Sequence, residues 1–529
     1  MELNGFVMKG KFLLKIFFFF MIFASFFMSC QKNERKSMNK LTINFQEGDL
    51  PSVHPHDLIV HLRGIGVGKL LFEGLTRVDE KGKIHLAGAE SLDISSDRLC
   101  YTFVLRDNKW SDGTPVTAFQ YENAWKEALS PTSACSRADL LYLIQNAEKV
   151  KKGELPLDAA GVKAVDAKTL VVHLSSPSSF FLDLLAQPIC APLIDPKSKT
   201  VTAFNGPFVI DSWQRDNSLK LRSNPNFWNK KNIALEQIEI LMMSDPSTVF
   251  NAYDNGQIDW IGLPISSLTM EQIQDFQTKN VLKFQPVERS FWINLNTSHP
   301  VLSSRTIRQA LSLAVDRESV TRHIMIGGQP LRRVLSESLL PVKMRASSLI
   351  IEDQKEAQSQ FQQGLLELGI SKEKLPPLTI SYAHANRKKF AEYLQETWKR
   401  VLGIDVRVKH VEWNVLRKNL ESGHFEICPG YEAAYYHDPM EILDRIGTVS
   451  PSNFSQWVHS GYRNFISQAH QESDSERRFQ LLGKAEEILL QEIPMIPICT
   501  DKFFFTHRPG LKGYAFDCVG AIDFSYASF

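Results

Sequence analysis

Residues 378–409 constrain the fold more than any other stretch, because they switch between two periodicities. Residues 378–383 are typical of a short strand, and residues 404–409 alternate apolar and polar side chains as a second strand does. Between them, residues 387–402 place apolar side chains at helical spacing, and Gly403 is suited to end the helix. A strand, a helix and a strand in this order predict a βαβ unit, and therefore an α/β fold with a partly parallel sheet.

The segment 430–439, GYEAAYYHDP, follows the next predicted strand, 424–428. Three of the chain's twelve tyrosines lie in these ten residues, with Glu432 among them. Open α/β sheets bind their ligands at the carboxyl ends of the strands. We therefore expect this segment to contact a ligand. The packed end of a strand, without a ligand, is the alternative.

The N-terminus has the pattern of an export signal. Three lysines precede an apolar run, residues 16–29, which is fourteen residues long. A membrane-spanning helix needs about 20 apolar residues, so we predict that residues 1–29 are a signal peptide. Ser29 and Cys30 resemble the end of a bacterial lipobox, although Phe27 stands where leucine is usual. The sequence thus predicts lipidation at Cys30 and a membrane-anchored periplasmic lipoprotein. An ordinary signal peptide with an incidental cysteine is the alternative.

Composition limits the classes of partner. Hydrophobic residues make up 43% of the 529 residues and charged residues 22%, as in globular proteins. A chain of this length predicts two to four domains. The formal net charge is +1, so we expect no nucleic-acid partner, because phosphate binding needs a basic face. Six cysteines besides Cys30 include no CxxC pair, and their disulfide state stays open.

Catalytic motifs are absent from the sequence. It contains no HExxH, GxSxG or GKS/GKT pattern. Residues 63–68, RGIGVG, do not match a phosphate-binding loop, and we expect a flexible turn there. His54, His56 and His61 lack an accompanying cysteine or carboxylate cluster, so we expect solvated histidines rather than a metal site. The chain is therefore expected to be a binding protein, not an enzyme, with no metal and no cofactor.

A family resemblance rests first on three neighbouring stretches: LFEGL at 71–75, YTFVLR at 101–106 and KWSDGTPVT at 109–117. They closely resemble the peptide-binding proteins of bacterial ABC importers. These form the extracytoplasmic solute-binding protein family 5, which includes the oligopeptide- and dipeptide-binding proteins. Further stretches match in the family's order: GVKAVD at 161–166, NGPF at 205–208, NPNFW at 224–228, NGQID at 255–259, RQALSLAVDR at 308–317 and Glu412-Trp413.

The resemblance implies a two-lobed periplasmic-binding-protein fold (type II) with a hinge and an extra inserted α+β domain. Lobe I would comprise residues 40–72, 204–297 and 499–529, domain II the inserted residues 73–203, and lobe III residues 298–498. The lobes would close over a short peptide held extended by backbone hydrogen bonds. A monomeric binding protein would then deliver the peptide to an inner-membrane ABC permease with ATPase subunits.

The resemblance also implies which residues bind the ligand: Trp413, Tyr431, Glu432, Ala433, Ala434 and Tyr435. In the oligopeptide branch, a segment like G-W-x-A-D-Y supplies an aspartate that pairs with the peptide's α-ammonium group. Here the aspartate position falls on Ala434 or Tyr435, and neither carries a negative charge. Three explanations stay open: Glu432 takes over, an acid from elsewhere does, or the ligand has no amino terminus at this place. If Glu432 takes over, Glu432→Gln weakens free-amine peptides more than N-acetylated ones.

Two other functions are compatible with these observations. The same fold could bind another solute, such as a modified peptide, a metal chelate or haem. An anchored chaperone or surface interaction protein is the second alternative. If defined short peptides stabilise the folded protein against heat, peptide capture is favoured over both alternatives.

Overall fold

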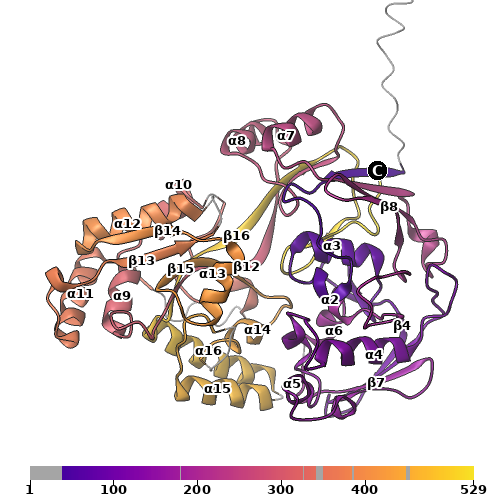
Figure 1. Ribbon diagram of the computed structural model, residues 1–529, viewed down its shortest axis with the longest axis horizontal. Helices are drawn as coiled ribbons and strands as arrows, with labels where there is room; N and C mark the ends of the chain where they lie inside the picture. The colour runs from indigo at the N-terminus through magenta and orange to yellow at the C-terminus, as the bar shows by residue number, and fades with distance from the viewer. Residues whose placement is uncertain are drawn as a thin grey trace, which may run out of the picture.

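The computed structural model describes residues 39–178, 180–325, 327–340, 350–383, 387–447, 453–472 and 474–529. The predicted signal peptide, 1–29, and the predicted lipidation site, Cys30, lie outside these residues. Figure 1 shows two bodies, one mainly indigo to magenta and one mainly orange, joined by the long strands β12 (Lys283–Leu295) and β16 (Met495–His507). The yellow C-terminal end of the chain returns to the first body. The fold is therefore α/β and two-lobed, as the sequence predicts.

Lobe I is built on a four-stranded sheet in the order β1-β10-β9-β8. β1 is parallel to β10, and the other neighbours are antiparallel. Its strands are β1 (Lys40–Asn44), β8 (Phe208–Gln214), β9 (Ser218–Ser223) and β10 (Gln237–Leu241), with the short strands β11 (Trp260–Gly262), β17 (Ala515–Phe516) and β18 (Ile522–Asp523). Its helices are α2 (Pro55–Leu58), α3 (Leu62–Leu71), α7 (Pro246–Asp254) and α8 (Met270–Thr278).

Domain II has its own antiparallel sheet, in the order β4-β5-β7-β6. The helix α4 (Ala118–Leu129) begins with a capping box between Thr117 and Gln120 and buries Tyr121 and Trp125 completely. One hydrophobic core runs through domain II and lobe I without a break. The other elements are β2 (Thr76–Val78), β3 (Ile84–Leu86), β4 (Ala89–Ile94), β5 (Cys100–Leu105), α5 (Ala147–Lys151), β6 (Val162–Ala164), β7 (Thr169–His173) and α6 (Phe181–Leu184).

Lobe III contains the predicted βαβ unit, in which β13 (Leu378–Tyr382) and β14 (Val406–His410) are parallel and joined by α12 (Lys388–Leu402). Gly403 ends α12 with a left-handed φ of 66°. The sheet order is β11-β16-β12-β15-β13-β14, with β15 (Ile427–Ala433) beside β13. The remaining helices are α9 (Arg305–Leu313), α10 (Arg317–His323), α11 (Gln354–Leu368), α13 (Trp413–Glu421), α14 (Met440–Leu443), α15 (Ser460–Gln471) and α16 (Ser475–Glu492).

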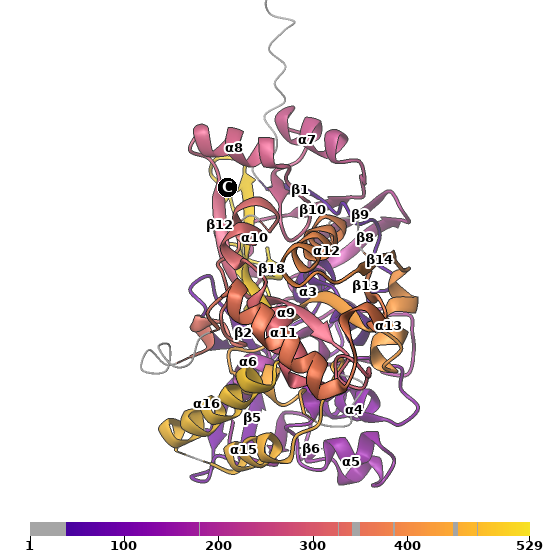
Figure 2. The same ribbon diagram turned by 90° about the vertical axis from the view of Figure 1, so that its left-hand side faces the viewer.

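Each face of the lobe III sheet carries its own apolar core. Phe291 and Ile293 of β12 pack with Phe390 and Trp398 of α12 on one face. Trp292, the neighbour between them in sequence, packs on the other face with residues of α14, α15 and α16. This alternation is the period of two that a strand imposes. Figure 2 looks onto this lobe and shows α9 and α11 side by side in front of the sheet.

β12 and β16 are the only described strands that run through both bodies. Phe505 of β16 packs in the core of lobe I, whereas Cys499 of the same strand packs in lobe III. The register between β12 and β16 shifts from Val287 to Ser290, where the strands leave lobe I. The sequence-based domain boundaries stay a proposal. They divide β16 between residues 498 and 499, whereas all of β12 falls within the proposed lobe I.

The expectation of a flexible turn at residues 63–68 is wrong, because these residues lie inside α3. The glycines allow close packing of the helix. A Cβ on Gly64 would lie 2.5 Å from the Leu58 carbonyl oxygen, and a Cβ on Gly66 2.6 Å from that of Ile522. The helix therefore approaches backbone on two sides, and only glycine fits there.

The histidines of the same region also differ from expectation. His61 is exposed, as predicted, but His54 and His56 are only 7% and 4% exposed. They are buried because α2 packs against α3 and against the turn Pro188–Cys190 of domain II. Burial lowers the pKa of His56 to about 3, so its ring is neutral.

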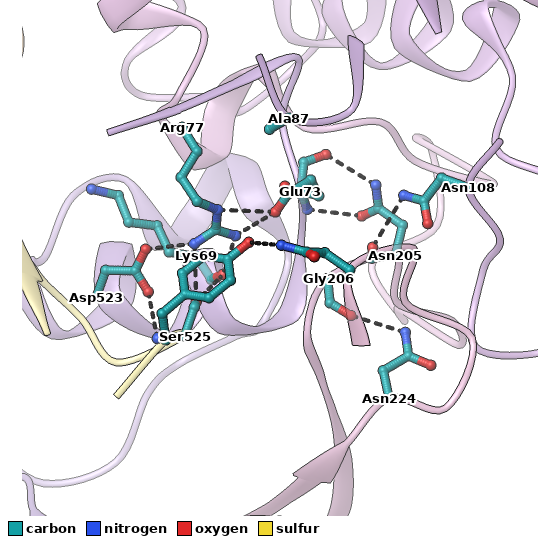
Figure 3. A network of polar contacts seen from close by, with 12 residues as sticks. Lys69, Glu73, Arg77, Ala87, Asn108, Asn205, Gly206, Asn224, Asp523 and Ser525 are labelled. Carbon is teal, nitrogen blue, oxygen red and sulfur yellow. Dashed lines mark hydrogen bonds and ion pairs between the residues drawn. The ribbon is translucent and has the colours of Figure 1, made fainter. Parts of the chain in front are cut away.

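Several of the family-like stretches meet in one buried polar network, shown in Figure 3. Arg77 pairs with Glu73 and, at 2.5 Å, with Asp523 from the far end of the chain. The Asn205 side chain bonds the backbone of Glu73, donating at 3.0 Å and accepting at 3.1 Å. Asn224 donates to the carbonyl oxygen of Gly206 at 2.9 Å. These stretches therefore fasten domain II to lobe I.

Candidate ligand-binding site

The strands of lobe III bring the predicted site residues to one edge of the sheet. β13, β14 and β15 are parallel, so their carboxyl ends lie at the same edge. α13 begins at this edge, where the Glu412 side chain caps it by accepting from the Val415 N–H at 3.1 Å. Trp413 follows on the first turn of α13 and is 42% exposed. Trp413 and the end of β15, both predicted to bind the ligand, therefore lie at the edge where α/β sheets bind ligands.

Tyr431 lies between two guanidinium groups. Arg289 and Arg387 stack on its ring at 4.3 and 4.4 Å from the centroid, and Phe291 lies 5.0 Å away. Burial raises the pKa of Tyr431, so the hydroxyl stays protonated. Asp501 pairs with Arg289 at 3.2 Å. This stack holds the ring in a fixed orientation at the sheet edge.

Glu432, the next residue, points to the opposite face of the strand. Its carboxylate pairs with Arg445 at 3.2 Å, and Arg445 also pairs with Glu441 at 2.7 Å. Burial raises the pKa of Glu432, and the guanidinium of Arg445 opposes that rise. A ligand ammonium at Glu432 would therefore share this carboxylate with a guanidinium.

Ala434 and Tyr435, where the resemblance puts an acid, have different surroundings. The Ala434 methyl group is 0% exposed and packs in the apolar cluster with Trp292 and Met440. The Tyr435 ring lies 4.1 Å beneath the guanidinium of Arg137 from domain II. One position is thus apolar core, and the other is stacked against a cation.

The residues after Tyr435 dock on domain II. The rings of Tyr436 and Phe180 stack 3.9 Å apart and 2° from parallel. The His437 N–H donates to Asp183 at 3.2 Å. In Figure 1, α14 follows this segment and lies beside domain II near α6.

Sequence reasoning missed the residues that domain II contributes: Arg137, Phe180, Asp183 and Gln187. Gln187 donates to the Tyr435 carbonyl oxygen at 3.3 Å. These residues are separated from segment 430–439 by roughly half the chain, and no local pattern marks them. Only the packing of domain II against lobe III brings them to the site.

Comparison with known proteins decides the family. The sequence profile described as "Bacterial extracellular solute-binding proteins, family 5 Middle" matches residues 83–454. The chain belongs to this family. Its members are solute-binding proteins of importers, which agrees with the resemblance seen in the sequence.

A relative of full length supports the assignment. The oligopeptide-binding protein OppA of Bacillus subtilis is 32% identical over 526 residues, covering 94% of each chain. The substrate-binding domain of an oligopeptide ABC transporter from Bacillus anthracis superposes with a TM-score of 0.80 at 29% identity, covering 92% of this chain and 98% of the other.

A third comparison bears on the arrangement of the lobes. The Escherichia coli murein tripeptide-binding protein MppA superposes with a TM-score of 0.81 at 26% identity, covering 93% of this chain and 98% of the other. An unliganded open form of MppA gives 0.68 at the same identity, covering 90% and 94%. The arrangement of the lobes in this chain is therefore less similar to the open form of MppA than to the other MppA structure.

Within the described part of the chain, no helix combines the length and the apolar character that crossing a bilayer requires.

Proposed function

We propose that this protein is an extracytoplasmic solute-binding lipoprotein that captures short peptides between its lobes and delivers them to an ABC permease. The observation that carries the proposal is the match over nearly the whole chain, at 32% identity, to a protein named for oligopeptide binding. The family consists of solute-binding proteins, and we propose that this chain likewise binds its solute without catalysis.

The arrangement of the lobes supports capture by closure. Two strands, β12 and β16, connect the bodies, and segment 435–438 bridges them a second time through domain II. A ligand between the lobes would favour the closed arrangement by contacting both bodies at once. Closure then presents a new surface to the permease and its ATPase subunits.

We propose that the ligand lies along the edge formed by Trp413, Tyr431, Glu432, Ala433, Ala434 and Tyr435. Trp413 and Tyr431 would contribute ring surface. Ala433 and Ala434 would contribute backbone, since the Ala434 side chain is buried in the core. Backbone recognition tolerates many side chains, which suits a carrier of mixed peptides.

The export features complete the proposal. A signal peptide at 1–29 and lipid on Cys30 would hold the mature protein at the membrane surface, where the permease lies. We propose a monomer, as two lobes of one chain suffice to enclose a peptide. Mass spectrometry of the native protein tests the anchor, because lipidation at Cys30 adds acyl mass that Cys30→Ala removes.

Thermal denaturation with defined peptides tests the proposed function. A ligand that binds only the folded protein stabilises it by RT ln(1 + [L]/Kd), about 2.7 kcal/mol at a hundredfold excess over Kd. We expect Tm to rise with the concentration of tri- to pentapeptides and to stay constant with the corresponding free amino acids. No rise with any peptide, together with haem or a metal chelate found by native mass spectrometry, would favour the other-solute alternative.

A further inference from the structure

The junction of lobe III with domain II contains several carboxylates, most of which already have a cationic partner. Glu432, Asp438, Glu441 and Asp517 each have an arginine or lysine nitrogen within 3.2 Å. Their charges are compensated inside the protein. A ligand cation at any of them would compete with a resident guanidinium or ammonium group.

Asp183 is different. It lies in α6 of domain II, is partly exposed, and accepts the His437 N–H at 3.2 Å. Among the described residues, no side-chain nitrogen of a lysine, arginine or histidine lies within 4.0 Å of its carboxylate. Burial raises the pKa of Asp183, and the nearby negative charge of Asp517 adds to the rise. A positive charge brought to this carboxylate would therefore be stabilised.

Gln187, one turn after Asp183, supplies a second observation. It is 2% exposed, and its Nε2 donates to the Tyr435 carbonyl oxygen at 3.3 Å and to Asp517 at 3.4 Å. Its Oε1 is buried and has no hydrogen-bond donor among the described residues. A buried acceptor without a donor costs free energy, which a ligand N–H would recover.

We propose that Asp183 and Gln187 of domain II accept the ligand's α-ammonium group, in place of the acid that the strand lacks at Ala434 and Tyr435. The proposal rests on the proposed peptide-binding function and deepens it. It names the ligand class as peptides with a free amino terminus.

The chemistry of the site fits an ammonium group. The group carries three N–H donors and one positive charge, and Asp183 offers a charge and Gln187 an acceptor. The two side chains bond to residues two apart in one segment, since Gln187 donates to the Tyr435 carbonyl oxygen and Asp183 accepts from the His437 N–H. The other charged groups near Asp183 are already engaged: Lys69 with Asp517 at 2.6 Å, and His437 with Glu288 at 3.5 Å. The charge of Asp183 is left for the ligand.

The test uses the mature chain and isothermal calorimetry. The probes are the tightest binder among tri-, tetra- and pentaalanine and the same peptide N-acetylated. Asp183→Asn removes the charge but keeps an oxygen that accepts the His437 N–H, so the docked segment stays in place. Glu90→Gln, an exposed acid of the same domain, is the matched control.

For Asp183→Asn we expect free-amine affinity to fall about tenfold or more, since the negative charge that pairs with the ammonium group is lost. The N-acetylated peptide and the Glu90→Gln control should change by less than about twofold. Equal losses for both peptides would reduce Asp183 to a structural role and overturn the proposal. An amine-selective loss in Glu432→Gln instead would assign the ammonium to Glu432. Wild-type protein that binds no peptide would overturn both the inference and the proposed function.

Discussion

At the scale of single residues, charge compensation dominates the end of β15 and the segment that follows it. Arg445 holds Glu432 and Glu441, and Arg478 holds Asp438 with two bonds of 2.7 and 2.8 Å. Burying such charges is costly even when they are paired, and removing either partner would leave the other charge buried without compensation. The segment is therefore preorganised before any ligand arrives.

Glu441 provides a pH test of this arrangement. Burial raises its pKa from 4.5 to about 7, although Arg445 and Arg137 oppose the rise. A carboxyl with a higher pKa in the folded state binds its proton more tightly there than in the unfolded chain. Its contribution to stability is therefore present below about pH 4.5 and is lost as pH rises through 7.

We expect Glu441→Gln to remove this dependence. Between pH 5 and pH 8 the free energy of unfolding of the wild type should fall relative to the variant, by up to about 3 kcal/mol. Urea denaturation of the wild type and the variant at several pH values measures this difference in the free energy of unfolding. Glu396→Gln, exposed on α12, should show no such trend. If the free energy of unfolding of the wild type instead rose relative to the variant between pH 5 and pH 8, the ion pairs of Glu441 would outweigh the cost of burying its charge.

At the scale of elements, α3 shows how close packing uses glycine. Gly66 faces the backbone of β18, and an added Cβ would lie 2.6 Å from the Ile522 carbonyl oxygen. Backbone yields less easily than a side chain, so the helix or the strand would have to shift.

We therefore expect Gly66→Ala to destabilise the protein by about 1–3 kcal/mol, even though alanine favours helix. Glu396→Ala on α12 is the control and should stay within about 0.5 kcal/mol. Urea denaturation of the two variants measures the difference. A stabilised Gly66→Ala would show that helix propensity outweighs the close approach.

Elements with strong periodicity could be predicted from the sequence. The βαβ unit at 378–409 has the predicted order and parallel pairing. The strand predicted at 424–428 begins later, at Ile427, and includes Gly430 to Ala433 of the tyrosine-rich segment. Period-two alternation is weak across a Cys-Pro-Gly sequence, so its boundary could not be located.

The residues that escaped prediction depend on tertiary contacts. Glycine within α3 looks like a turn unless the close approach of Ile522 is known. Asp183 belongs to the short helix α6 and Gln187 precedes the turn Pro188–Cys190, and no motif marks either residue. The sequence shows that Ala434 and Tyr435 stand where relatives have an acid. An acid supplied by another domain can be recognised only in the folded chain.

At the scale of the whole molecule, the two bodies are joined twice. β12 and β16 form a continuous connection, and the stack of Tyr436 on Phe180 forms a contact that can open. Phe180 is 5% exposed and Tyr436 8%, so the pair buries apolar surface between lobe III and domain II. Opening the lobes would expose both rings to water.

The stack should therefore set how much of the unliganded protein is closed. Phe180→Leu keeps an apolar side chain but removes the ring, and aromatic pairs contribute about 0.5–1.5 kcal/mol beyond their buried area. Because the ring stacks on Tyr436 and carries no charge, the loss should be equal for free-amine and N-acetylated peptides, about three- to tenfold in Kd. Asp183→Asn, in contrast, should affect only the free amine.

Calorimetry and small-angle scattering measure the two consequences together. The unliganded Phe180→Leu variant should have a larger radius of gyration than the wild type, and saturating peptide should restore it. Phe119→Leu is the control, since Phe119 is 46% exposed on α4 of the same domain. If Phe180→Leu changes neither the radius of gyration nor the peptide affinity, the ion pairs around Glu441, rather than the stack, hold domain II to lobe III. In that case Glu441→Gln, and not Phe180→Leu, should enlarge the unliganded molecule.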